Sequence, residues 1–414
     1  MLEATIELVG RVLLFDEPAD AVVGAFFREH RALGARDRPA VADTVYTVLR
    51  RLEVYRHLAA SGSGKPERRL TLLGWQGGAE VRDALLAPEE EEWLGRCERV
   101  DPASLPDAVR DNLPEWIAAP LQRLLGGEFR EWVASNEAPA PLDLRVNLLK
   151  ARRDDVLERL RREGIQVLPT PWSPIGVRVS GKPSLQRLSL FTDGSVEVQD
   201  EGSQLLALIT GARRGETVVD FCAGAGGKTL AIGAQMRNTG RLYAFDVSGH
   251  RLAQLKPRLV RAGVTNVHPT QIAHERDEHV ERLAGKVDRV LVDAPCTGVG
   301  TLRRHPDLKW RQTPAILAAL APQQRSILAA AARLVKPGGR LIYATCSVLE
   351  AENEAVAHDF DAAFGASFAR LPLLEPLQRA QVERPEALVS GENLRLWTHQ
   401  HGTDGFFAAA WRRR

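Results

Sequence analysis

Two cysteines, one of them close to an aspartate, form the most chemically suggestive pattern in this sequence. Asp293 and Cys296 follow the apolar run 290–292, and Cys346 follows the strand-like run 340–345. In an open parallel sheet, ligands bind in the crevice outside the carboxyl ends of the strands. The pattern therefore predicts that two thiols and a carboxylate meet in one reaction centre.

The other two cysteines, Cys97 and Cys222, give no such signal. Four cysteines spread over 414 residues do not form a disulfide framework, and no Cys-x-x-Cys pair suggests zinc or dithiol chemistry. We therefore expect reduced thiols and no metal site. A lone buried cysteine is more often a small packing residue than a nucleophile.

A glycine-rich stretch, residues 220–229, follows a strand-like run and precedes a helical one. A phosphate-binding P-loop needs glycine five residues before Gly227, where Cys222 stands. A dinucleotide fingerprint needs glycine five residues after Gly224, where Thr229 stands. Both nucleotide interpretations therefore fail.

A cofactor without a pyrophosphate remains compatible with this loop. Asp246 ends the next strand-like run, 22 residues after Gly224, where a carboxylate can hold ribose hydroxyls. S-adenosylmethionine is the natural candidate for such a cofactor. A purely structural turn is the alternative, because glycines also serve tight turns without a ligand.

The rest of the chain predicts three successive parts. Apolar residues at helical spacing indicate an all-α domain over 1–134, and Pro-Ala alternation at 136–141 indicates a linker. Two short strands around a charged helix at about 152–163 predict a small α+β subdomain over 135–195.

Strand, glycine turn and helix then alternate over 196–414, which predicts a parallel sheet covered on both faces. The strand-like runs are Thr217–Phe221, Arg241–Asp246, Val287–Asp293 and 340–345, and 336–339 reads as the turn before the last of them. The predicted fold class is therefore α/β.

Charge and hydropathy limit the partners of the protein. The net charge of +2 conceals an acidic first part, with 17 Lys and Arg against 23 Asp and Glu in 1–134, and a basic remainder with 38 against 30. A basic surface suits a polyanion such as RNA, and a solvated surface is the alternative. No apolar run approaches the ~20 residues of a membrane span, so we expect a cytoplasmic protein without membrane contact.

The motifs together resemble the RsmB/Sun-type family of RNA cytosine-5 methyltransferases, which is related to the NOP2 and NSUN types. The resemblance is carried by 220–229, by 293–298 with 303–310, and by 344–347 with 352–354. Segments 144–147, 198–201 and 403–407 also resemble family segments. The resemblance implies a Rossmann-like methyltransferase domain with a mostly parallel seven-stranded sheet.

Residues 1–134 resemble, more faintly, the NusB-type helical domain that precedes the catalytic part in one branch of this family. The similarity lies in 36–38 and 45–51. An RNA-binding module of this type is expected to be basic, and this one is acidic. The departure argues against direct RNA contact by this part.

The resemblance also implies roles for particular residues. Cys346 is the nucleophile that adds to carbon 6 of cytosine, Asp293 acts at ring nitrogen 3, Cys296 assists release, and Lys228 orders the catalytic loops. A thiolate is needed because carbon 5 becomes nucleophilic only after carbon 6 has been attacked. The cofactor residues implied are Cys222, Ala223, Gly224, Ala225, Gly226, Gly227, Lys228, Asp246, Gln271 and Asp293.

Two positions depart from the family pattern at the cofactor site. Ala225 stands where the family has proline, and the acidic residue expected to meet the adenine is replaced by Gln271 or by His274. A glutamine carbonyl can still accept from the adenine amino group.

The resulting hypothesis is a monomeric methyltransferase that uses S-adenosylmethionine and acts on RNA, with ribosomal RNA as the expected substrate. Transfer RNA and a non-catalytic assembly factor are the alternatives. An amino-group methyltransferase is disfavoured, because such enzymes carry Asn/Asp-Pro-Pro-aromatic where this chain has Asp293-Ala-Pro-Cys296.

Overall fold

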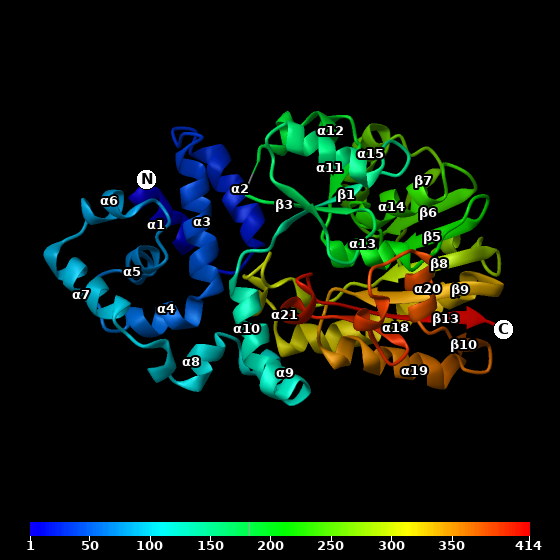
Figure 1. Ribbon diagram of the computed structural model, residues 1–414. Coiled ribbons are helices and arrows are strands. Elements are labelled where there is room, and N and C mark those ends of the chain that lie inside the picture. The colour runs from blue at the N-terminus through cyan, green and yellow to red at the C-terminus, as the bar shows by residue number, and fades with distance from the viewer. Residues whose placement is uncertain (182) are drawn as a thin grey trace. The chain divides into compact units, whose positions relative to one another are not determined.

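A computed structural model describes residues 1–181 and 183–414, and the chain forms two compact units (Figure 1). We call Met1–Pro139 with Thr301–Pro314 the helical unit, and Ala140–Gly300 with Ala315–Arg414 the sheet unit. The chain therefore leaves the sheet unit after Gly300 and returns to it at Ala315. This excursion was not predicted from the sequence, and the division into three domains stays a prediction.

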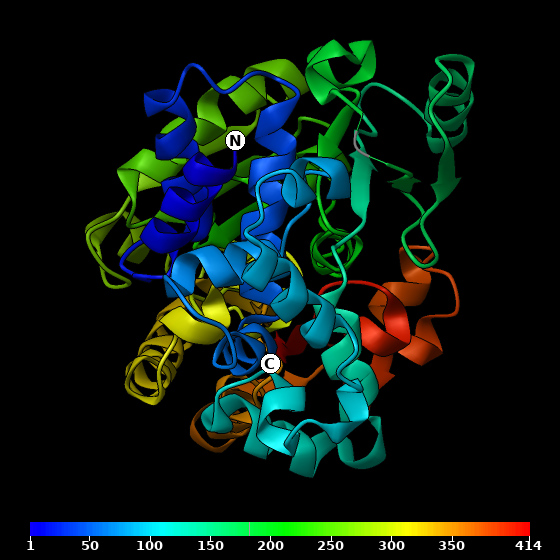
Figure 2. The same cartoon turned by 90° about the vertical axis from the view of Figure 1, so that its left-hand side faces the viewer.

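Amphipathic helices build Met1–Pro139, the part of the helical unit shown in blue to cyan in Figure 2. Helix α3 begins at Asp37 and buries Leu49 on its inner face. Phe26 and Leu52 join the same apolar cluster. The α-helices of Met1–Pro139 are α1 (Leu2–Val12), α2 (Ala19–Glu29), α3 (Asp37–Arg50), α4 (Leu52–Ala59), α5 (Pro66–Leu73), α6 (Ala79–Asp83), α7 (Pro88–Glu98), α8 (Asp107–Asp111), α9 (Glu115–Leu125) and α10 (Phe129–Glu137).

The segment Thr301–Pro314 belongs to this unit because its side chains are bonded into it. It carries α17 (Leu308–Arg311). The Lys309 ammonium donates to the carbonyls of Arg50 at 2.7 Å and Asn112 at 3.2 Å, and the Trp310 indole donates to the Leu49 carbonyl at 3.3 Å. A segment that resembles a catalytic motif thus completes the core of the helical unit.

A small antiparallel sheet opens the sheet unit. Its strand order is β2-β3-β1-β4, and α11 (Arg153–Arg162) buries Val156 and Leu160 in its core. The predicted charged helix is therefore present. The strands are β1 (Leu142–Val146), β2 (Val167–Pro169), β3 (Gly176–Val179) and β4 (Val196–Val198).

The large sheet has the order β11-β12-β13-β9-β8-β5-β6-β7, with β10 beside β13. Strands β5 to β9 are mutually parallel, which confirms the Rossmann-like fold class. The described residues contain nine strands in this sheet, so the expected seven was wrong, because short strands extend the β13 edge. The strands are β5 (Thr217–Phe221), β6 (Arg241–Asp246), β7 (Val267–Gln271), β8 (Val287–Asp293), β9 (Val335–Thr345), β10 (Phe368–Arg370), β11 (Val389–Ser390), β12 (Asn393–Leu396) and β13 (Phe406–Arg413).

Helices cover both faces of the large sheet (Figure 1). In β8, Val290 and Val292 point to the cluster that holds α18 and α19, whereas Leu291 points to the cluster that holds α13 and α14. None of the helices in the described chain is long and apolar enough to cross a membrane. The remaining helices of this unit are α12 (Ser189–Thr192), α13 (Glu201–Leu208), α14 (Gly227–Gln235), α15 (Gly249–Ala262), α16 (Glu278–Glu281), α18 (Pro314–Leu334), α19 (Glu354–Phe364), α20 (Leu374–Arg379) and α21 (Thr398–His401).

Strand β9 corrects one detail of the sequence analysis. The predicted turn at 336–339 lies inside the strand as an irregularity, because Val287 pairs with Val335 and Arg289 already pairs with Arg340. Gly338 has φ +76°, a left-handed value that glycine adopts without strain. Beyond this bulge the strand continues to Thr345, the end of the predicted strand-like run.

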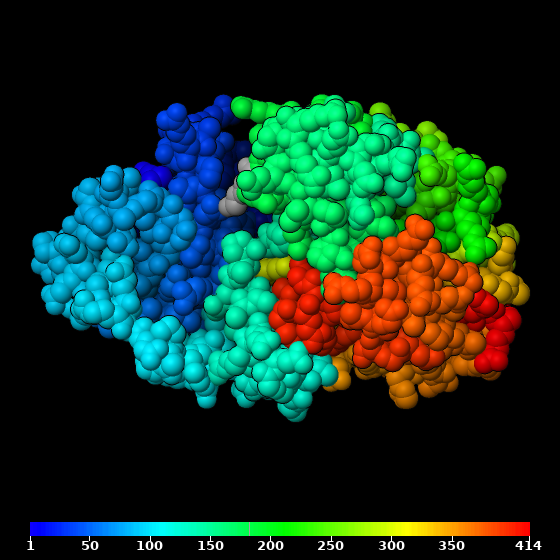
Figure 3. All heavy atoms as spheres, viewed as in Figure 1, coloured from blue at the N-terminus to red at the C-terminus, as the bar shows by residue number. Residues whose placement is uncertain are grey.

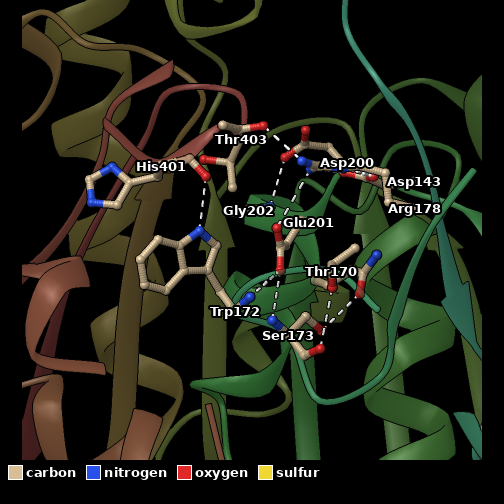
Figure 4. A network of polar contacts seen from close by, with 12 residues as sticks. Asp143, Thr170, Trp172, Ser173, Arg178, Asp200, Glu201, Gly202, His401 and Thr403 are labelled. Carbon is tan, nitrogen blue, oxygen red and sulfur yellow. Dashed lines mark hydrogen bonds and ion pairs between the residues drawn. The ribbon is translucent and has the colours of Figure 1, made fainter. Parts of the chain in front are cut away.

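A buried polar network joins the small sheet to the large one (Figure 4). Glu201, at the start of α13, accepts from the backbone amides of Trp172 at 2.6 Å and Ser173 at 2.7 Å. Asp200 accepts from the Gly202 amide at 2.7 Å and from the Asp404 amide at 3.2 Å. Two segments that carry the family resemblance, 198–201 and 403–407, therefore meet each other in the structure.

Candidate active site at the carboxyl edge of the sheet

The two predicted thiols lie in contact. Cys346 follows the last residue of β9, Cys296 lies three residues after the end of β8, and their sulfur atoms are 3.3 Å apart. The Ala294 amide donates to the Ala344 carbonyl at 2.9 Å, so the two chains still run side by side as they leave the sheet. The adjacency of β8 and β9 thus brings together residues that are 50 positions apart.

The surroundings of Cys296 hold its proton on the sulfur. The hydrogen bond to Cys346, together with burial, raises the pKa of the Cys296 thiol well above its usual value. A protonated Cys296 can donate the hydrogen bond to the Cys346 sulfur. Only the thiolate form of a cysteine is a good nucleophile.

A buried ion pair stands beside the thiols. Lys228, in the first turn of α14, donates to a carboxylate oxygen of Asp293 at 2.7 Å. Burial lowers the pKa of Lys228, but the charge and the hydrogen bond of Asp293 outweigh it, so the pKa is raised. The lysine therefore stays charged, next to the predicted acid.

A fully buried carboxylate, Glu352, ties the two cysteine loops together. It accepts from the Thr297 amide at 2.8 Å, from the Thr297 hydroxyl at 2.5 Å and from the Gln324 amide nitrogen at 3.1 Å. The Tyr343 hydroxyl donates to the Glu352 carbonyl at 2.6 Å. Thr297 follows Cys296 directly, so Glu352 fixes that loop relative to the loop after β9.

Sequence reasoning missed this function of Glu352. In the sequence, Glu352 stands out only as part of the run 352–354 that carries the family resemblance. An acidic residue so close to a candidate nucleophile is a usable signal, but its partner Thr297 is 55 positions away and becomes visible only in the fold.

The glycine loop makes the predicted tight turn. Cys222, Gly224 and Gly226 have φ of +69°, +58° and +81°, all left-handed. A Cβ on Gly224 would lie 2.3 Å from a guanidinium nitrogen of Arg251, and one on Gly226 would lie 2.2 Å from Leu255. A side chain at either position would be strained and would collide with α15, so the glycines let the loop pack closely against this helix.

Asp246 holds the loop from the end of β6. One of its carboxylate oxygens accepts from the Gly224 amide and the other from the Ser248 amide, both at 2.7 Å. The carboxyl group is buried, with 4% of the residue exposed. Asp246 therefore shapes the loop as well as being available to a ligand.

One cavity of about 480 Å³ joins the cofactor residues to the thiols. Cys296, Cys346 and Asp293 line it together with Asp246 and Cys222. The turn that follows Cys222 is formed by Ala223, Gly224, Ala225, Gly226 and Gly227. The volume lies within the usual range of small-molecule sites.

The residues of this cavity fit S-adenosylmethionine. Asp246 offers a carboxylate for ribose hydroxyls, and Val247, although apolar, is 61% exposed and lines the cavity with Ile272. An exposed apolar side chain beside a carboxylate suits a flat base attached to a ribose.

Of the two residues predicted for the adenine end, His274 lines this cavity and Gln271 does not. The Gln271 side-chain amide donates to the Val247 carbonyl at 3.2 Å.

Comparison with known proteins identifies the family. The family model of the 16S rRNA methyltransferases RsmB/F matches residues 207–412. The model of the "Methyltr_RsmF/B-like, ferredoxin-like domain" matches residues 113–186. A probable ribosomal RNA small subunit methyltransferase B of Bacillus subtilis is 33% identical over 348 residues, which cover 83% of this chain and 76% of the relative. The chain belongs to the RsmB/F methyltransferase family.

Solved structures agree with this membership. The crystal structure of PH0851 superposes with a TM-score of 0.79 at 25% identity, over 99% of this chain and 98% of that one. A methyltransferase homolog from Pyrococcus horikoshii gives 0.64 at 30% identity, over 76% of this chain and 100% of that one. As an RsmB/F member the protein is an S-adenosylmethionine-dependent RNA methyltransferase, which confirms the predicted family, enzyme class and cofactor.

Proposed function

We propose that this protein methylates carbon 5 of a cytidine in ribosomal RNA through a covalent adduct with Cys346. The observation that carries the proposal is the pair of sulfurs 3.3 Å apart, in one cavity with Asp293 and Asp246. The name of the Bacillus subtilis relative supports ribosomal RNA as the substrate.

The first step is attack by the Cys346 sulfur on carbon 6 of the cytosine. The raised pKa of Cys296, caused by the bond to Cys346 and by burial, keeps the shared proton on Cys296. The charged Lys228 lies close enough for the Cys346 thiolate to help raise its pKa, and it stabilises the thiolate in return. Carbon 5 gains electron density as the sulfur–carbon bond forms.

Asp293 and Lys228 act together at ring nitrogen 3. Negative charge develops there during the attack, and a preorganised donor in a buried site stabilises such charge. The Lys228 ammonium donates to Asp293 at 2.7 Å, so it holds a proton that Asp293 can pass on to the base. Asp293 lines the cavity beside the base, and Lys228 supplies the positive charge, so we assign the stabilisation of ring nitrogen 3 to the pair.

The cofactor supplies an electrophilic methyl group when it is bound. We assign its ribose to Asp246 and its base to the wall of Val247 and Ile272. His274 meets the edge of the base in preference to Gln271, whose amide is already donated to the Val247 carbonyl. The loop from Cys222 to Gly227 positions the rest of the cofactor.

Cys296 completes the reaction as a base. Its pKa is raised first of all by the bond to Cys346, and that cause disappears when the Cys346 sulfur is bonded to carbon 6. Cys296 then loses its proton to solvent and accepts the proton from carbon 5, while the carbon–sulfur bond breaks. The product and a free Cys346 thiolate are released.

The target cytidine must leave its stack to reach these groups, so we propose a single-stranded or loop position. A monomeric cytoplasmic enzyme without a metal ion is part of the same proposal, as is the division into parts 1–134, 135–195 and 196–414. Transfer RNA as substrate and a non-catalytic assembly role are the alternatives that the experiment addresses.

Transfer of a labelled methyl group tests the proposal. The purified protein is incubated with labelled S-adenosylmethionine and with ribosomal RNA or transfer RNA from cells that lack the gene, and modified cytidines are located by bisulfite sequencing. Label in a ribosomal RNA cytidine is the expected result. Label in transfer RNA alone would identify transfer RNA as the substrate. No label in either RNA would favour the non-catalytic assembly role.

A further inference from the structure

A second cavity, of about 430 Å³, lies at the opposite edge of the large sheet, near the amino ends of the parallel strands. Five arginines contribute to its lining: Arg213, Arg237, Arg289, Arg340 and Arg379. Among the described residues no Asp or Glu lines it. This set of residues, which we call the arginine cavity, is not used by the methyl-transfer site.

Two of these arginines have a structural task that brings them together. Arg289 and Arg340 are paired on the adjacent strands β8 and β9. Arg289 donates to the Thr210 carbonyl at 2.7 Å and Arg340 to the Ile209 carbonyl at 3.0 Å, at the carboxyl end of α13. Such carbonyls carry the negative end of a helix dipole.

The dipole of one helix end does not neutralise the charge of the cavity. Arg289 has a carboxylate partner, Glu216 at 2.6 Å, whereas the Arg340 guanidinium donates to the carbonyls of Ile209 and Thr210. Burial first, and then the positive charges of Arg289, Arg412 and Arg379, lower the pKa of Arg340 to about 10. The inner end of the cavity is therefore strongly positive.

The rim adds two exposed arginines from different elements. Arg379, on α20, pairs with Glu375 one turn earlier, and an exposed pair of this kind contributes little and opens readily. Arg213 precedes β5 and is exposed. Helix α20 packs against α13, and its orange surface borders green segments of the same unit in Figure 3.

We propose that the arginine cavity binds a phosphate group. Guanidinium groups match phosphate oxygens in two-point contacts, and several converge here from separate elements around a hollow of sufficient size. The phosphate comes either from the backbone of bound RNA or from a free phosphate compound. Binding of an RNA phosphate rests on the proposed function, whereas binding of a free phosphate compound does not.

The position of the cavity suits a contact remote from the reacting base. Arg340 and Thr345 are five residues apart on β9, which corresponds to roughly 17 Å between the arginine cavity and the start of the cysteine loop. Phosphate contacts fix the position of a nucleic acid on a protein without reading its bases. RNA held here would be oriented for the distant site.

Paired substitutions at the rim test the site without removing the two arginines that cap α13. The full-length double variant Arg213→Gln and Arg379→Gln removes two charges from the cavity. The matched control is Arg282→Gln with Arg333→Gln, because Arg282 pairs with Glu278 as Arg379 pairs with Glu375, and Arg333 is an exposed arginine outside the lining. Binding of a labelled 12-nucleotide oligocytidylate and of inorganic pyrophosphate is measured against salt.

If RNA is the source, the cavity variant weakens oligocytidylate binding, and the log–log salt slope falls by about 0.7 for each lost contact, while the control matches the parent. If a free phosphate compound is the source, the variant loses pyrophosphate binding and keeps RNA binding. Equal behaviour of variant, control and parent toward both probes would overturn the proposal. Methyl transfer by the parent is assayed separately, so failure of the proposed function is recognised independently.

Discussion

At the scale of single residues, the site depends on where one proton lies. Cys296 and Cys346 are chemically identical side chains, and only their surroundings distinguish them. The hydrogen bond to Cys346 and burial raise the pKa of Cys296, whereas the charged Lys228 lies near Cys346. The proposed division of roles between nucleophile and base therefore rests on the position of each thiol.

Glu352 is expected to act as a positioning residue for the thiol pair. In Glu352→Gln, one of the two acceptor oxygens that hold Thr297 becomes an NH₂ donor, which costs about 1–3 kcal/mol of stability. A displaced Cys296 loop should lower kcat roughly 10²-fold. The affinity for S-adenosylmethionine should change little.

The control for this variant is Glu350→Gln, an exposed acid two residues earlier. Steady-state kinetics and cofactor titration are measured for both proteins. A Glu352→Gln enzyme with normal kcat would show that the thiol geometry does not depend on this carboxylate.

Asp246→Asn tests the cofactor end of the cavity. The variant keeps an oxygen for one of the two backbone amides but loses the charge offered to ribose hydroxyls, so binding should weaken by about 1.5–3 kcal/mol, or roughly 10- to 150-fold. Calorimetric titration measures the change, with Asp359→Asn, a surface substitution on α19, as control. Unchanged affinity in a folded variant would remove Asp246 from the cofactor site.

At the scale of elements, the sequence predicted what local patterns determine. Apolar runs and glycine turns located the ends of β5, β6, β8 and β9, and those ends define the carboxyl edge. Short strands such as β11 have too few residues to show a period, so the sheet was predicted too narrow. The choice between Gln271 and His274 also needed the fold, because it depends on which side chain faces the cavity.

The excursion Thr301–Pro314 was missed because its anchors are far away in sequence. Lys309 donates to carbonyls of residues that lie 259 and 197 positions earlier. Nothing in the local pattern distinguishes this buried lysine from a solvated one. The helical unit therefore contains a stretch of the chain that lies between Cys296 and Cys346 in the sequence.

Lys309 gives this element a pH signature. Burial lowers its pKa to about 7, whereas an unfolded lysine binds its proton up to about pH 10.4. Between these values the unfolded chain binds more protons, so this residue makes stability rise as the pH rises from 7 to 10. Lys309→Met should remove that contribution.

The measurement is the stability difference between parent and variant, taken from denaturant unfolding at pH 7.5, 8.5 and 9.5. The difference should shift in favour of the parent as the pH rises. Lys65→Met, an exposed lysine of the same unit, should show no such trend. A pH-independent difference for Lys309→Met would mean that burial does not lower the pKa of this lysine.

At the scale of the whole molecule, charge is divided along the chain. The first 134 residues are acidic and the remainder is basic. We therefore expect ultraviolet cross-linking of the full-length protein to bound RNA to place the cross-links in Ala140–Gly300 and Ala315–Arg414, with mass spectrometry as the readout. Cross-links concentrated in 1–134 would contradict this expectation.

The central claim is that the two thiols have opposite tasks, and one gel decides it. Cys296→Ala, incubated with substrate RNA and S-adenosylmethionine, should form an adduct that cannot be resolved, seen as a protein–RNA band that survives denaturing electrophoresis. Cys346→Ala should give no such band and no turnover. Methylation by Cys346→Ala, or a covalent band from Cys346→Ala in place of Cys296→Ala, would contradict the assignment.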